Sequence, residues 1–147
     1  MDKRKRAQRI QLISPESDVP CLQNGRKARL RTEDKQMLLT RELANQLRRN
    51  SDNSETAQHD HKPVVKFFTP DANATWLFSE LASDGDTLFG LCDLGHGYPE
   101  LGYASLAEIS TLRGRLGLLV ERDHHFTADK PLSAYADAAR SRSRIVA

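Results

Sequence analysis

The chain has 147 residues, of which 38% are hydrophobic and 29% are charged, so it has the length for one domain with a core of moderate size and for polar segments outside that core. The formal net charge of +2 hides an asymmetry: residues 1–31 hold nine Lys or Arg and three Asp or Glu, whereas residues 36–133 hold nine and fourteen. No apolar run has the length of a membrane-spanning helix, and no apolar signal segment follows the basic start. The composition therefore argues against a membrane or secreted protein and indicates a cytoplasmic one.

Residues 1–36 are predicted to form a basic, disordered arm. The segment has high charge density and no sustained apolar period, and Pro15 and Pro20 would interrupt a helix. Lys and Arg side chains on such an arm neutralise phosphates and bind nucleic acid without sequence preference. The candidate contacts are Lys3, Arg4, Lys5, Arg6, Arg26, Lys27, Arg29 and Arg31. A solubilising tail is the simpler interpretation of the same residues.

The first regular element is predicted to be a helix over about residues 41–49. Thr40 is a suitable N-cap, and leucines at 39, 43 and 47 recur every four residues as one apolar stripe. The polar stretch 50–60 that follows is predicted to be a loop.

Strand patterns then follow one another through short connections. They cover residues 63–69, 74–81, 87–93, 100–104 and 118–121, and an Asp-Gly pair marks the turn after the second of them. Short connections favour antiparallel neighbours, because parallel strands need a long crossover. The order of the first four segments therefore predicts an antiparallel meander, and 118–121 is predicted to be a further short strand.

Two further helices are predicted in the second half of the chain. Ser105 and Glu108 form the capping-box pattern of a helix over 106–113, for which Gly114 is the expected end. A last helix begins near Pro131, and residues 134–147 form a tail rich in alanine and arginine. The predicted fold class is thus α+β, a single domain over 37–133 with an antiparallel sheet of four to five strands packed by two to three short helices.

Four acidic residues near strand ends form a possible polar site: Glu80, Asp93, Glu100 and Glu121. If they converge on one rim of the sheet, their oxygen atoms would suit Mg²⁺ or Mn²⁺, ions that support phosphodiester chemistry. The simpler interpretation is that they are strand-edge charges paired with neighbouring Lys and Arg. The spacing demands no metal, and the sequence indicates no cofactor.

Other reactive residue types have structural explanations. Ser105 is better explained as a helix cap than as a nucleophile, and Cys92 lacks the flanking pattern of a catalytic cysteine. The run His59-Asp60-His61 and the pair His124-His125 do not have the ligand spacing of a zinc site. Cys21 and Cys92 are too few for a disulfide framework and fit a reducing compartment. No catalytic residue is assigned.

Several short motifs, in this order, resemble the small bacterial domain-of-unknown-function family 2958. The motifs are Met37-Leu38-Leu39-Thr40-Arg41-Glu42-Leu43, Val64 to Pro70 with Trp76 and Glu80, Phe89 to Asp93, Glu100 to Tyr103, Ser105 to Glu108, and Glu121-Arg122-Asp123 with Pro131-Leu132. The resemblance covers about residues 37–133. It implies a small bacterial protein of a kind often carried on plasmids and other mobile elements, and it implies no activity. The basic arm, His96 and the His124-His125 pair depart from the family pattern.

Three functions follow from these observations. The first is a small non-catalytic accessory or interaction protein of bacterial mobile elements, with another protein as its partner. The second is a metal-dependent enzyme acting on nucleic acid through a rim of carboxylates. The third is a nucleic-acid-binding module that uses the basic arm.

Overall fold

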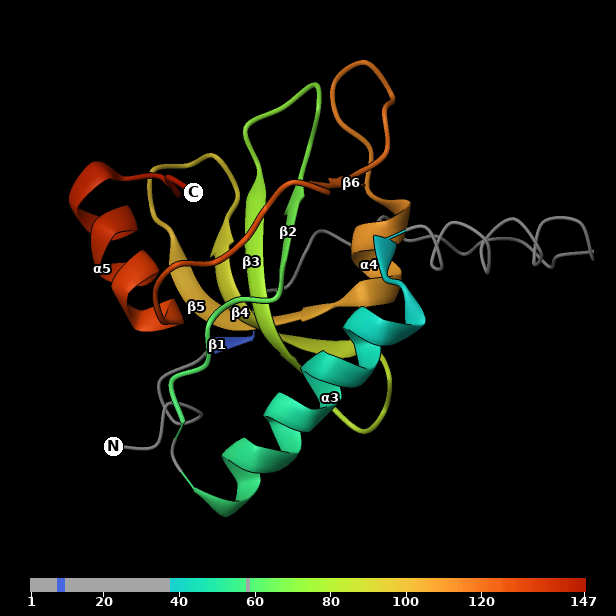
Figure 1. Cartoon of the computed structure of the whole chain (residues 1–147). Coiled ribbons are helices and arrows are strands. Elements are labelled where there is room, and N and C mark those ends of the chain that lie inside the picture. The colour runs from blue at the N-terminus through green and yellow to red at the C-terminus, as the bar shows by residue number, and fades with distance from the viewer. Residues whose placement is uncertain (1–7, 10–37, 58) are drawn as a thin grey trace, which may run out of the picture.

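The computed structural model describes residues 8–9, 38–57 and 59–147. Within them a six-stranded sheet has the order β1-β5-β4-β3-β2-β6 and is packed by helices (Figure 1). The strands are β1 (Gln8–Arg9), β2 (Val65–Phe68), β3 (Thr75–Leu81), β4 (Thr87–Asp93), β5 (Glu100–Ser105) and β6 (Glu121–Arg122), and the helices are α3 (Arg41–Thr56), α4 (Leu106–Thr111) and α5 (Leu132–Arg142). Strands β2 to β6 pair antiparallel. The predicted α+β class is confirmed, and so is the antiparallel meander for β2 to β5, whereas β6 returns to pair with β2.

One face of the sheet packs against α3 and α4. We call the apolar cluster on this face the α3-side core, and its fully buried large members include Leu47, Phe67, Trp76, Phe78 and Ile109. Leucine is its most frequent side chain, and the rings of Phe67 and Phe78 meet edge to face at 5.7 Å between centroids. Aromatic and leucine side chains bury the largest apolar areas, so this face supplies much of the hydrophobic stabilisation of the fold.

Helix α3 begins where the sequence predicts, because the Thr40 hydroxyl accepts a hydrogen bond from Leu43 N. It then continues to Thr56, so the prediction of a loop from residue 50 was wrong. The polar second half of the helix bonds to β3: Asn50 Nδ2 donates to Ser79 O (2.9 Å), and Ser54 Oγ donates to the Glu80 carboxylate (2.7 Å). These tertiary hydrogen bonds outweigh the weak helix propensity of Asn, Ser and Asp.

Strand β3 contains an irregularity at the point where α3 bonds to it. Its pairing with β4 shifts between Phe78 and Glu80, which leaves Ser79 as the extra residue of a β-bulge. Simple alternation would place Trp76, Phe78 and Glu80 on one side. Because of the extra residue, Leu81 joins Trp76 in the α3-side core instead.

The junction of β5 and α4 is capped as the sequence predicts, with an unpredicted partner. Ser105 Oγ accepts from Glu108 N (3.2 Å) and donates to the Asp86 carboxylate (2.7 Å). Asp86 also accepts from Ala107 N (2.8 Å), the donor that an isolated helix would leave unpaired. Helix α4 ends at Thr111 rather than at Gly114, so Gly114 has another role.

The other face of the sheet packs against α5. We call this cluster the α5-side core; its buried members are Leu77, Phe89, Leu91, Leu132, Tyr135, Ala136 and Ala139. The segment that the sequence describes as an alanine- and arginine-rich tail thus contains most of a helix packed on β4 and β5 (Figure 1). Small alanine side chains bring the helix close to the sheet. Asp60, which precedes β2, bonds to Ser133 N (3.2 Å) and to the Ser133 hydroxyl at the start of α5.

At the N-terminal end, Gln8–Arg9 form β1, which pairs parallel with Gly102 and Tyr103 of β5. These two residues belong to the segment predicted to be disordered. The rest of that segment lies outside the described residues.

Candidate functional site

The four carboxylates of the predicted polar site lie on four different strands. Glu80 is buried (3% exposed) in β3, where its carboxylate accepts from Ser54 Oγ of α3. Glu100 and Glu121 are exposed on β5 and β6, which are separated by the whole width of β4, β3 and β2. Strand pairing places Glu100 opposite Cys92 and Glu121 opposite Phe68, so Glu100, Asp93 and Glu121 lie along one end of the sheet but are spread across its width. Glu80 lies further along β3, and the described residues do not bring the four carboxylates together in one cluster.

Asp93, the fourth carboxylate, lies at the end of β4 and is 4% exposed. Its two oxygens accept from two backbone amides, Gly95 N (2.9 Å) and Ile145 N (3.0 Å). The first bond holds the turn after β4, and the second attaches the segment that follows α5. Asp93 therefore joins two distant parts of the chain.

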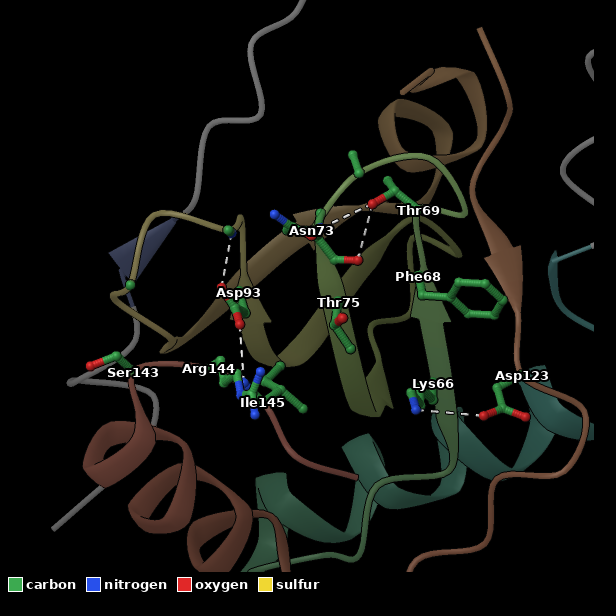
Figure 2. A pocket seen from close by; sticks show the side chains of 14 residues that line it. Lys66, Phe68, Thr69, Asn73, Thr75, Asp93, Asp123, Ser143, Arg144 and Ile145 are labelled. Carbon is green, nitrogen blue, oxygen red and sulfur yellow. Dashed lines mark hydrogen bonds and ion pairs between the residues drawn. The ribbon is translucent and has the colours of Figure 1, made fainter. Parts of the chain in front are cut away.

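Asp93 also lines a hollow of about 680 Å³ that is open to solvent. The hollow lies between β2, β3, the turns at one end of the sheet and the segment after α5 (Figure 2). Its polar lining includes Lys66, Thr69, Asn73, Thr75, Asp93, Asp123 and Arg144. Two cationic and two anionic side chains are present, so the lining has no strong net charge. It suits a polar, uncharged or zwitterionic group.

Most polar atoms around this hollow already have a partner. Lys66 Nζ donates to Ala147 O (2.8 Å) and lies 3.5 Å from the Asp123 carboxylate (Figure 2). The pKa of Asp123 is lowered by the hydrogen bond that its carboxylate accepts from His125 N and, secondarily, by Lys66. Thr69 Oγ1 accepts from Ala74 N (2.9 Å). The described residues that line the hollow include Lys66, Thr69 and Thr75 but no His, Cys or Glu.

The remaining reactive side chains also have structural roles. Cys92 is buried in the α3-side core, and burial raises the pKa of its thiol, which keeps it as an unreactive thiol. Ser105 caps α4 as predicted. His124 Nδ1 lies 3.0 Å from Arg122 Nη2 on the exposed edge at β6. Among the described residues no three His, Cys, Asp or Glu side chains are grouped so that they could hold a metal ion.

Three aspartates in loops were not predicted to be important. Asp60, Asp71 and Asp86 each accept backbone hydrogen bonds from a segment distant in sequence. Their only signal in the sequence is their position in turns, where Asp is common for local reasons. The distant partner is a property of the fold, and sequence spacing does not reveal it.

The eight basic residues proposed as nucleic-acid contacts lie outside the described residues. In the part of the chain that is described, no helix is both long enough and apolar enough to cross a bilayer. Among the described residues, the exposed large apolar side chains lie on loops and on the segment after α5: Tyr98, Leu116, Leu118 and Val146.

Comparison with known proteins gives one result. Neither the curated proteins nor the solved structures contain a match to this chain. A family model described as "Protein of unknown function (DUF2958)" matches residues 38–146, which include every described helix and all strands except β1. The chain therefore belongs to the DUF2958 family.

Proposed function

We propose that this protein is a small, non-catalytic accessory protein that acts by binding another protein in the bacterial cytoplasm. Association with plasmids or other mobile elements is part of this proposal and rests on the resemblance described above. One observation carries the proposal: the side chains that could act as acids, bases, nucleophiles or metal ligands stabilise the fold instead. Glu80, Asp93, Ser105 and Cys92 are each buried or bonded to the protein itself.

The metal-dependent enzyme is the weaker alternative, because Glu80, Asp93, Glu100 and Glu121 do not converge. A divalent ion that bound them would stabilise the folded state by mass action. We expect the melting temperature to be the same with and without millimolar Mg²⁺ or Mn²⁺. A metal-dependent rise that Glu100→Gln or Glu121→Gln removes would support the enzyme and count against our proposal.

The nucleic-acid-binding module rests on the arm alone. Fluorescence anisotropy of labelled duplex DNA would compare the full chain with a variant in which Lys3, Arg4, Lys5 and Arg6 are replaced by Gln. Salt-dependent binding that weakens in the variant would favour this module, because each neutralised phosphate releases counterions.

The direct test of the proposal is cross-linking of the tagged full chain in its native cells, followed by reconstitution with the purified captured protein. We expect a saturable complex of fixed stoichiometry that survives replacement of Cys92 by Ala and of Glu121 by Gln. Absence of any saturable protein partner would overturn the proposal.

A further inference from the structure

A short hairpin between α4 and β6 presents apolar side chains to solvent. We call residues 113–118 the Leu116 hairpin. An isolated bridge joins Arg113 to Leu119, and Gly114 N donates to Leu118 O (2.9 Å). Gly117 N then donates to Gly114 O (3.0 Å), which closes a tight turn with residues 115 and 116 at its tip. Figure 1 shows this loop extending beyond β6, beside the loop that joins β2 and β3.

The tip contributes nothing to either core. Leu116 is 81% exposed and Leu118 is 47% exposed, whereas most large apolar side chains that the structure describes are buried. A single exposed leucine needs no explanation. Two on one six-residue hairpin, in a domain with few other exposed apolar side chains, mark this hairpin as unusual.

The hairpin is also held in place by Asp71, a residue from another loop. The Asp71 carboxylate, from the loop between β2 and β3, accepts from Leu116 N (2.6 Å) and Leu118 N (3.3 Å). A Cβ atom at Gly114 would overlap that carboxylate, so the residue must be glycine for Asp71 to approach. Arg113 Nη1 donates to Gly117 O (2.7 Å) and closes the turn from its other side. The backbone at Leu116 is therefore held in place, which reduces the backbone entropy that binding would cost.

The charge around the tip indicates the chemistry of a partner. Arg115 directly precedes Leu116 and is exposed, and the exposed Arg113 lies two residues earlier, where its guanidinium also donates to Gly117 O. Arginine is enriched at the centres of protein interfaces, where its planar group binds carboxylates in a bidentate manner. An exposed leucine with an exposed arginine directly beside it complements an apolar pocket whose edge carries Asp or Glu.

We infer that the Leu116 hairpin is a docking element that inserts Leu116 into an apolar, acid-edged pocket of a partner protein. This inference rests on the proposed function and names the surface through which it operates. The carboxylate of Asp71 has a positioning role, because it holds the hairpin through two backbone amides and does not reach the tip itself.

The first experiment places a photo-reactive phenylalanine analogue at position 116 of the full chain in its native cells. The matched control carries the same analogue at Tyr98, which is equally exposed (81%) on the loop between β4 and β5. We expect a cross-linked product at 116 that is absent at 98. The cross-linked protein is then identified, purified and used as the probe for binding measurements.

The second experiment compares variants by the dissociation constant for that protein. Leu116→Ser and Arg115→Glu should each weaken binding about tenfold or more, since a fully buried anchor accounts for a large share of interface energy. Tyr98→Ser should leave it unchanged. Gly114→Ala keeps every side chain of the tip but displaces Asp71, and it should also weaken binding. Raised salt should weaken the wild type more than Arg115→Gln.

The outcomes separate this inference from the proposed function. Cross-links at 98 but not at 116, or binding that Leu116→Ser leaves unchanged, would overturn the docking hairpin and leave the interaction protein standing. Cross-links at 116 only to a second copy of this chain would replace the partner by self-association and overturn the inference. Absence of specific cross-links at both positions would count against the proposed function as well. Because Leu116 is exposed, we expect the Leu116→Ser variant to fold. Its melting temperature should match that of the wild type.

Discussion

The two faces of the sheet differ in the side chains that pack on them and in how fully helices cover them. The α3-side core is continuous and rich in Trp, Phe and Leu, and α3, α4 and residues 38–39 cover it. On the other face, α5 packs mainly on β4 and β5 through Leu132, Tyr135 and two alanines, and the polar hollow lies beside β2 and β3. The first face supplies stability, and the second is held together by specific hydrogen bonds to backbone amides. The α5-side face is therefore the face of the sheet that is less completely covered by the protein's own helices.

The largest expected effect tests the α3-side core. Trp76→Ala should reduce the free energy of unfolding by about 3–5 kcal/mol, because Trp76 is fully buried and its loss leaves a cavity. Tyr103→Ala, on the partly exposed edge of the α5-side core, should cost clearly less. Chemical denaturation of both variants measures the difference. Equal losses would contradict the view that the two faces contribute unequally.

The next effect tests how the segment after α5 is attached. Asp93→Ala leaves Gly95 N and Ile145 N without their acceptor and should cost about 1–3 kcal/mol. Asp93→Asn retains one carbonyl acceptor and should cost less. Hydrogen exchange should accelerate at Ile145 while the amides of β3 stay protected. Uniform acceleration throughout the sheet would show instead that this face is essential to the whole fold.

A smaller effect concerns the cap that closes the α3-side core. Ser105→Ala should cost about 0.5–2 kcal/mol, because Glu108 N loses its acceptor. Asp86→Ala removes the acceptor of Ala107 N at the same helix start. Since both side chains serve one cap and bond to each other, a double-mutant cycle should show coupling of about 0.5 kcal/mol or more. Strict additivity would mean that Ser105 and Asp86 act independently.

The smallest effect is a pH dependence on the open half of the second face. The pKa of Asp123 is lowered in the folded state by the N–H of His125 and by Lys66. Its contribution to stability is therefore present above the unfolded pKa of about 3.9 and is lost as pH falls through the folded value. The stability difference between wild type and Asp123→Asn should shrink below about pH 4. Lys66→Met leaves the His125 N–H in place and should retain most of this dependence; complete loss in that variant would make Lys66 the main cause.

Much of the fold could be predicted because its signals are local. The apolar runs of β3 and β4, the alternation in β5, the Asp-Gly turn at residues 84–85 and the caps Thr40 and Ser105 each depend on neighbours in sequence. Short connections between successive strands then required antiparallel pairing. The family resemblance also rested on such local motifs, and the family match includes them.

The errors and omissions share one cause, which is a partner distant in sequence. The polar half of α3 was predicted to be a loop because its residues favour loops locally. It is helical because Asn50 and Ser54 bond to β3, about thirty residues away in the sequence. Gly114 was predicted to end a helix, whereas it makes room for Asp71. Four carboxylates at strand ends were grouped as one possible site, but strand order separates Glu100 from Glu121.

The sequence alone thus determined the class of fold, the meander and the positions of most elements, because side-chain alternation and capping act over a few residues. Only the tertiary structure decided which side chains have hydrogen-bond partners and which remain for a ligand. Burial and pairing depend on strand order, on the bulge at Ser79 and on the packing of α5. For that reason Glu80 and Asp93 became structural residues, whereas Leu116, unremarkable in the sequence, emerged as the candidate contact.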